Sequence, residues 1–124
     1  MTPEADRWHR DLDTRTQDRV TSVLDALHTH GPGLARPQAD TIRGSRHRNM
    51  KELRSGTVRI LFAFDSERRG IVLVGGDKRG SWRGWYKQNI KQADRMYDDH
   101  LRNTGRTVPW TRRETGRTSV EKDR

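Results

Sequence analysis

The chain has 124 residues and a formal net charge of +9, from 26 Lys and Arg against 17 Asp and Glu. A surplus of this size favours a polyanionic partner such as nucleic acid, and the absence of cysteine excludes disulfide and thiol chemistry. No apolar run approaches the roughly 20 residues of a membrane-spanning helix, and no signal peptide is visible, so we expect a cytoplasmic protein with no membrane partner.

Two helices are predicted at the start of the chain. Residues 3–12 favour a short helix with a proline in its first turn. Residues 14–30 form the clearest helix, because four aliphatic residues recur at i, i+3, i+4 and i+7 and a Gly-Pro-Gly sequence follows. That apolar stripe consists of Val20, Val23, Leu24 and Leu27.

Three strands are predicted next. Residues 41–54 favour an extended and strongly polar strand, and residues 57–65 alternate apolar side chains on one face. Residues 71–76 begin with four consecutive aliphatics, which indicates a central strand buried on both faces. Together, residues 45–77 predict an antiparallel meander.

The last third of the chain predicts a helix and a tail. Residues 84–102 favour a helix with Ile90, Ala93, Tyr97 and Leu101 on its apolar face. Residues 103–124 favour a basic disordered tail, so the domain is expected to cover residues 1–102. The element order predicts an α+β fold, with helices packed on one face of a small antiparallel sheet and the other face solvated or used.

The stretch from Ser45 to Leu61 concentrates positive charge, with Glu52 as its only acid. Antiparallel pairing brings Arg59 beside this basic strand, and the third strand ends near Lys78. A sheet face that carries these cations would bind phosphate, whereas the alternative is an ordinary solvated face. The candidate phosphate-binding residues are Lys51, Arg54, Arg59 and Lys78.

Such a face suits RNA cleavage, in which the 2′-OH attacks the adjacent phosphate. Arginine suits the dianionic phosphorane, whereas lysine or histidine can move protons. The alternative for the single histidine of this stretch is a surface residue without a role. The predicted roles are proton transfer by Lys51 or His47, phosphorane binding by Arg54 and Arg59, and contact with the RNA backbone or the ribosome by Arg46 and Arg48.

Other chemistry has less support. The five histidines form no metal-ligand pattern such as H-E-x-x-H, so no metal or cofactor is predicted, and the segment GGDKRG favours a turn over a phosphate loop. Aromatic side chains either stack on unpaired bases or pack in a core. Core packing is favoured for Trp82 and Trp85, whereas Tyr86 and Tyr97 divide evenly between the two roles.

The segments KELR, RILFAFD, IVLVGGDK and MYDDHL, taken together, resemble the RelE/HigB-type toxins of bacterial type II toxin–antitoxin systems. The nearest branch of this RelE/ParE superfamily is the phage-derived, HigB-like one, and the resemblance covers about residues 3–102. It implies a compact α+β fold and a metal-independent endoribonuclease that cleaves mRNA, often on the ribosome, and so inhibits translation. It also implies a cognate antitoxin with a helix-turn-helix.

The resemblance also implies site residues. By position, it places functional basic residues at the four cations named above, with His47 as an addition, and polar or aromatic residues near the C-terminal end of the domain. Family members usually begin with a strand that this sequence does not show, so either the start site lies further upstream or the strand is absent and a sheet edge is exposed. The RNA contacts predicted in this way are Arg46, Arg48, Tyr86, Tyr97 and His100, with Asp98 beside them.

Two alternatives share the same fold. The ParE branch of the superfamily poisons DNA gyrase, and fold analogy does not separate it from the ribonucleases. The dense basic strand favours RNA over gyrase, because gyrase inhibition needs protein contacts. The other alternative is a catalytically inactive RNA-binding module.

Overall fold

The structure is a computed structural model that describes residues 1–35, 37–65, 67–80 and 82–102. The tail predicted over residues 103–124 lies outside this described part. The α+β class predicted from the sequence is confirmed. The elements are α1 (Pro3–Arg10), α2 (Thr14–His30), the 3-10 turn η1 (Gly31–Gly33), β1 (Ala39–Thr41), β2 (Lys51–Ser55), β3 (Val58–Phe64), β4 (Gly70–Asp77) and α3 (Trp82–Arg102).

The four strands form one antiparallel sheet in the order β1-β2-β3-β4. The predicted meander is confirmed, but the single strand expected over residues 41–54 is wrong. The chain forms the short β1, leaves the sheet for residues 42–50, and returns in β2. Gly44 adopts a φ of 94° within this excursion, a conformation that interrupts an extended strand.

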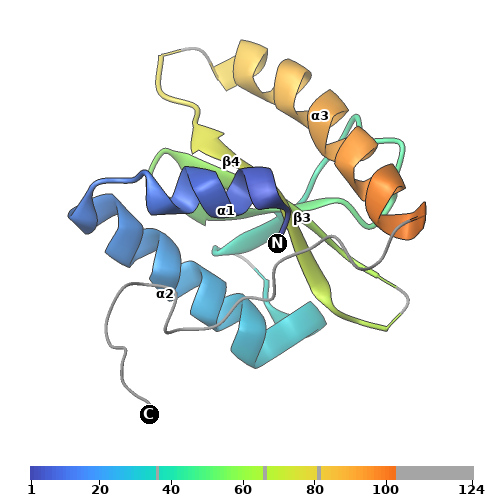
Figure 1. Cartoon of the computed structure of the whole chain (residues 1–124), viewed down its shortest axis with the longest axis horizontal. Coiled ribbons are helices and arrows are strands. Elements are labelled where there is room, and N and C mark those ends of the chain that lie inside the picture. Colours follow the sequence, from blue (N-terminus) through green and yellow to red (C-terminus); the bar gives the residue numbers. More distant parts are fainter. Residues whose placement is uncertain (36, 66, 81, 103–124) are drawn as a thin grey trace.

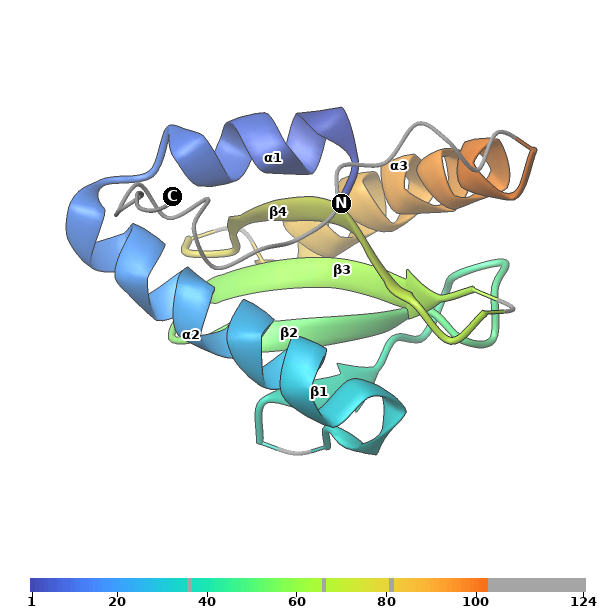
Figure 2. The same ribbon diagram turned by 60° about the horizontal axis from the view of Figure 1, so that its bottom comes forward.

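Helices lie on both faces of the sheet (Figures 1 and 2), and the buried apolar residues form a separate core on each face. Helices α1 and α2 cover one face, where Leu24 of α2 packs with Ile60 and Phe62 of β3. Helix α3 lies against the opposite face, where Ala93 packs with Leu61. The alternation predicted for β3 is therefore confirmed, and the second face, expected to be solvated or used, is covered by α3.

Strand β4 is an edge strand, not the central strand predicted from its four aliphatics. Its burial on both faces is confirmed, because Val72 joins the core under α1 and α2 while Leu73 joins the core under α3. No strand precedes α1 in the part of the chain that the structure describes. The edge is nevertheless covered at one point, where Thr2 donates from its backbone N–H to Val72 O at 2.8 Å and from its hydroxyl to Leu73 O at 2.8 Å.

Two glycines at the end of β4 admit tryptophan rings from both sides. A Cβ at Gly75 would lie 2.3 Å from the Trp8 ring of α1, and a Cβ at Gly76 would lie 2.5 Å from Trp85 Nε1 of α3. The Gly-Gly pair of the segment GGDKRG is therefore a packing site within a strand. The core role predicted for Trp85 is confirmed, but the core role predicted for Trp82 is wrong, because 53% of that residue is exposed.

Local signals set the ends of the N-terminal helices. Thr2 caps α1 by accepting a hydrogen bond from Ala5 N at 3.1 Å, and this helix ends at Arg10, two residues earlier than predicted. Asp13 caps α2 by accepting from Thr16 N at 3.2 Å, and Gly31 ends it with a φ of 54°. The predicted bounds of α2 are confirmed.

Candidate active site

The basic residues expected on one sheet face are divided between the two faces. In the register of β2 and β3, Lys51 pairs with Phe62, which belongs to the core under α1 and α2. Arg54 pairs with Arg59 one position out of phase with Lys51, so these two arginines lie on the α3 side. The predicted grouping of Lys51 with Arg54 and Arg59 is therefore wrong.

Both arginines on the α3 side are held by Glu52, whose side chain is buried. Arg54 Nε donates to Glu52 Oε2 at 3.0 Å, and Arg59 Nε lies 3.7 Å from Glu52 Oε1. The Tyr86 hydroxyl donates to Glu52 Oε1 at 2.6 Å, and burial together with this hydrogen bond raises the pKa of Tyr86. We call this group the Glu52 cluster: Asp40, Glu52, Arg54, Arg59 and Tyr86.

The guanidinium of Arg59 is committed to the protein itself. Its Nη1 donates to Gly56 O at 2.6 Å and to Val58 O at 3.0 Å, and its Nε donates to the Tyr86 hydroxyl at 3.2 Å. Arg54 is more accessible, with 36% of its side chain exposed, although its Nη2 lies 3.2 Å from Asp40 Oδ2. The cluster therefore pairs two of the four cations predicted to bind phosphate with carboxylates.

Lys78 lies apart from the Glu52 carboxylate. Its backbone N–H donates to Thr57 O at 3.1 Å, and its ammonium lies 5.8 Å from the centroid of the Trp82 ring. The fourth predicted cation thus lies between the turn that joins β2 to β3 and Trp82 at the start of α3.

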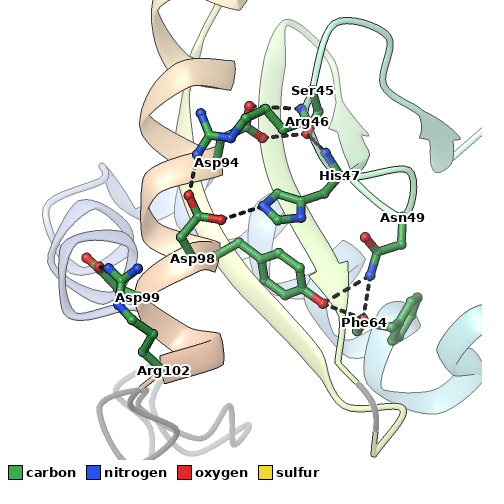
Figure 3. A network of polar contacts seen from close by, with 10 residues as sticks. Ser45, Arg46, His47, Asn49, Phe64, Asp94, Asp98, Asp99 and Arg102 are labelled. Carbon is green, nitrogen blue, oxygen red and sulfur yellow. Dashed lines mark hydrogen bonds and ion pairs between the residues drawn. The ribbon is translucent and has the colours of Figure 1, made fainter.

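The loop formed by residues 42–50 is fixed to α3 by the buried carboxylate of Asp94 (Figure 3). Asp94 accepts hydrogen bonds from the Ser45 hydroxyl and, at 3.1 Å, from the backbone N–H of Arg46. The Ser45 hydroxyl oxygen in turn accepts from the backbone N–H of His47 at 2.9 Å. These contacts fix the backbone just before and at the histidine.

His47 faces Asp98 one helical turn further along α3 (Figure 3). The distance between His47 Nε2 and Asp98 Oδ1 is 2.8 Å, and Arg46 contacts the other Asp98 oxygen. Burial raises the pKa of Asp98, but the hydrogen bonds from His47 and Arg46 outweigh it and lower the pKa below its ordinary value of 3.8. Asp98 is therefore a carboxylate at neutral pH, aimed at the imidazole.

Tyr97 packs edge-on against His47, with ring centroids 4.7 Å apart and an interplanar angle of 88°. Its hydroxyl donates to Phe64 O at 3.0 Å, and Asn49 donates to the same carbonyl at 2.7 Å. Tyr97 itself is 4% exposed. Buried packing thus orients one side of the imidazole. We call the group Arg46, His47, Tyr97 and Asp98 the His47 site.

His100 lies behind this site and is buried. Its ring stacks on Tyr97 with centroids 6.3 Å apart, and its Nε2 lies 3.3 Å from Asp65 Oδ2. Among the described residues, its Nδ1 has no hydrogen-bond partner. The predicted apolar face of α3 is confirmed for Ile90, Ala93 and Tyr97 but wrong for Leu101, because 52% of Leu101 is exposed and His100 is buried in its stead.

Only some residues of the His47 site and its surroundings were predicted from the sequence. Of the predicted residues, it brings together Arg46, His47 and Tyr97, with Asp98 from the same motif; Arg48 is exposed near them in sequence. Asp94 was missed, as were Ser45 and Asn49. The available signal for Asp94 was a carboxylate beside Ala93 on the apolar face of α3.

The described residues form a hollow near the His47 site but no metal-binding cluster. A hollow of about 330 Å³ lies beside Asp98, but His47 does not line it. No three His, Asp or Glu side chains converge as metal ligands in the described ranges, and no helix there is long and apolar enough to cross a bilayer. The hollow is lined by Glu4, Gln92, Arg95, Met96, Asp98, Asp99 and Arg102.

Comparison with known proteins gives one family and two curated relatives. Residues 7–98 match the family described as phage derived protein Gp49-like (DUF891). The chain is 46% identical over 111 residues to "Putative toxin HigB2" of Mycobacterium tuberculosis, covering 86% of this chain and 55% of the relative. It is 45% identical over 103 residues to "Putative toxin HigB3" of the same organism, covering 82% of this chain and 90% of the relative.

The chain thus spans about half the length of the first of these relatives and most of the second. No solved structure matches it. The match over residues 7–98 includes the whole His47 site and the whole Glu52 cluster.

Proposed function

Because this chain belongs to the family of phage-derived Gp49-like proteins, we propose that it is the toxin of a type II toxin–antitoxin system and acts as a metal-independent endoribonuclease on mRNA. The HigB-type resemblance seen in the sequence is confirmed by the two relatives, both named as HigB toxins. The ribonuclease activity rests on a further observation, which is the geometry of the His47 site.

The observation that carries the proposal is the His47–Asp98 pair at 2.8 Å. A carboxylate that accepts from one imidazole nitrogen fixes the ring and leaves the other nitrogen as a proton acceptor. The pair reaches the surface, since 19% of the His47 side chain and 32% of the Asp98 side chain are exposed. An RNA 2′-OH therefore has access to a held imidazole.

The reaction assigned to this site is a transesterification. His47 removes the proton from the 2′-OH, the 2′-oxygen bonds to the adjacent phosphorus, and the bond from phosphorus to the 5′-oxygen breaks. The 5′-oxygen takes up a proton as it leaves, and the products are a 2′,3′-cyclic phosphate and a 5′-OH end. Arg46, with 58% of its side chain exposed, is placed to stabilise the phosphorane charge.

The cations of the sheet receive smaller roles in this proposal. Arg59 is buried and donates from Nε and Nη1 to acceptors of the protein itself, so we assign it to structure. Arg54 and Arg48 are accessible enough to contact the RNA backbone. Lys51 is the first residue of β2 and directly follows the loop that carries His47. We propose that its ammonium contacts a phosphate of the bound RNA.

The partners follow from the same kinship. We propose that an antitoxin with a helix-turn-helix masks the His47 site and that mRNA is bound while it is translated on the ribosome. The net charge of +9 supports attraction to RNA.

The test is cleavage of a defined mRNA by the purified protein in the presence of EDTA, with the product ends identified by mass spectrometry. Cleavage is expected to leave 2′,3′-cyclic phosphate and 5′-OH ends. His47→Ala is expected to lower the rate about 10²- to 10⁴-fold. The matched control is His28→Ala, which removes an exposed histidine of α2 and is expected to leave the rate unchanged.

Two results contradict the proposal. The first is full cleavage by His47→Ala, which sinks the assignment of the site. The second is inhibition of gyrase supercoiling with transcripts left intact, which assigns the chain to the gyrase-directed branch.

A further inference from the structure

Trp82 is an exposed aromatic ring at the first residue of α3. It exposes 53% of its surface, and in the described part of the chain only Leu101 is a comparably exposed large apolar residue. Exposing an indole forgoes the stabilisation that its burial would give. Its neighbour Trp85, three residues on, is packed against the core, so the helix buries one tryptophan and displays the other.

Two cations flank the displayed ring. Lys78 Nζ lies 5.8 Å from the ring centroid, and Arg83 Cζ lies 5.5 Å from it. Both distances are within the range of a cation–π contact. Within the described residues, neither side chain forms an ion pair, in contrast to Arg54 and Arg59 of the Glu52 cluster.

Tyr86 also holds the Trp82 ring in place. Trp82 packs edge-on against Tyr86, with centroids 6.4 Å apart and an interplanar angle of 83°. The Tyr86 hydroxyl is fixed by Glu52 at 2.6 Å. An aromatic surface that is oriented before a ligand arrives loses less entropy on binding. The Glu52 cluster thus supports this ring even though its own charges are paired.

We propose that Trp82, Lys78 and Arg83 form a subsite for single-stranded RNA, in which Trp82 stacks on one unpaired base and the two cations contact its flanking phosphates. Stacking platforms beside cations are how proteins bind single strands without reading their sequence. Trp82 and Asp98 are separated by about 24 Å along α3 at 1.5 Å per residue. An RNA strand that occupies both this subsite and the His47 site therefore extends over several nucleotides beside α3. The inference rests on the proposed function in one respect, that the substrate is RNA.

A protein partner is the competing occupant, because tryptophan and arginine are also frequent at the centres of protein interfaces. The flanking cations favour RNA. A protein surface would have to supply a carboxylate to each cation, whereas one single strand supplies phosphates on both sides of the stacked base.

The experiment measures binding of a fluorescently labelled single-stranded RNA oligonucleotide in the His47→Ala background, so that binding is separated from cleavage. Trp82→Ala is expected to weaken binding about 5- to 150-fold, and Trp82→Phe is expected to retain most of the affinity. Leu101→Ala is the matched control, since Leu101 is 52% exposed at the other end of α3, and it is expected to have no effect.

The cations are tested by the salt dependence of the same affinity. Lys78→Ala and Arg83→Ala are each expected to reduce the slope of log affinity against log salt by about 0.7, the value for one phosphate of a single strand. Arg7→Ala removes an exposed arginine of α1 and is expected to leave the slope unchanged.

Two outcomes overturn the subsite: no RNA binding, or an RNA affinity that Trp82→Ala leaves unchanged, the latter with or without weaker binding of the proposed antitoxin. Weaker binding of the antitoxin in that case assigns this surface to a protein interface. The proposed nuclease is judged separately. If the protein binds RNA through Trp82 but does not cut it, the subsite is supported and the proposed nuclease is contradicted. If the protein cuts RNA but Trp82→Ala does not change binding, the nuclease is supported and the subsite is contradicted.

Discussion

The two polar clusters beside α3 use similar residue types in different ways. In the Glu52 cluster, the Glu52 and Arg59 side chains are 5% and 10% exposed, and the arginine donors end on a carboxylate, a hydroxyl and backbone carbonyls. In the His47 site, His47 and Asp98 are 19% and 32% exposed, and a loop outside the sheet carries the histidine. A high density of positive charge in the sequence thus does not show whether the charge is available to a ligand.

The difference follows from where each cation is anchored. Arg59 is a strand residue on a covered face, and a buried guanidinium must be paired to offset its desolvation. Arg46 and His47 lie on a loop that needs only its backbone to be fixed, a role that Asp94 fills. Arg59 therefore serves the fold, whereas His47 keeps part of its side chain at the surface.

The largest effect is expected from a substitution that disrupts the His47 site. Asp98→Asn removes the carboxylate that holds the imidazole, so the cleavage rate is expected to fall about 10²- to 10⁴-fold. Because Asp98 acts through His47, kcat is expected to fall while KM changes little. Asp99→Asn is the control on the next residue, since the Asp99 side chain is 59% exposed and pairs only with Arg102 among the described residues. Equal rates for Asp98→Asn and Asp99→Asn would remove Asp98 from the mechanism.

The second effect breaks the Glu52 cluster and is expected in stability. Glu52→Ala leaves Arg59 and the Tyr86 hydroxyl without their buried acceptor, so the free energy of unfolding is expected to fall by about 3 to 5 kcal/mol. Urea denaturation measures this loss, and kcat per folded molecule is expected to be unchanged, because no residue of the Glu52 cluster takes part in the proposed transesterification. The control is Asp40→Ala, which removes a half-exposed carboxylate and is expected to cost less than about 1 kcal/mol.

The contrast between the clusters fails if Glu52→Ala lowers kcat while the protein stays fully folded. In that case Glu52 contributes to the reaction, and the purely structural role assigned to Glu52 and Arg59 is wrong.

Local sequence signals account for the fold better than for the site. The bounds of α2 were predictable because its stripe, its N-cap and its terminal glycine lie within 20 consecutive residues. The excursion of residues 42–50 was not, because Ser45 and Arg46 are held by Asp94, nearly 50 residues further along the chain. The separation of Lys51 from Arg54 was predictable, because residues three apart in a regular strand point to opposite faces.

The third effect tests how the loop is positioned. Asp94→Asn keeps the size of the side chain but replaces one acceptor oxygen by a donor group, which opposes the Ser45 hydroxyl or the Arg46 N–H. The cleavage rate is expected to fall about tenfold, because one charged hydrogen bond is worth about 1.5 to 3 kcal/mol and the loop keeps its contact to Asp98. Steady-state kinetics give kcat and KM separately for each variant. Ser45→Ala is also expected to lower the cleavage rate.

An unchanged kcat in Asp94→Asn would show that the Asp98 contacts alone position His47. A large loss of stability with kcat per folded molecule unchanged would place Asp94 in the fold instead of the site.

The smallest effect concerns the carboxylate behind the His47 site. Burial raises the pKa of Asp65, but hydrogen bonds from the backbone N–H of Arg69 and from the His100 and Arg69 side chains outweigh it and lower the pKa below 3.8. A lowered pKa in the folded state means that the unfolded chain binds the proton more tightly. The stability that this carboxylate contributes is therefore complete above pH 4 to 5 and is lost as the pH falls through the lowered value. Wild type is expected to exceed Asp65→Asn in the free energy of unfolding at pH 6, with the difference shrinking toward pH 2. The control is Asp18→Asn, on the exposed side of α2. If the difference in unfolding free energy between wild type and Asp65→Asn stays constant with pH, the variant is destabilised by lost packing and not by the lost charge.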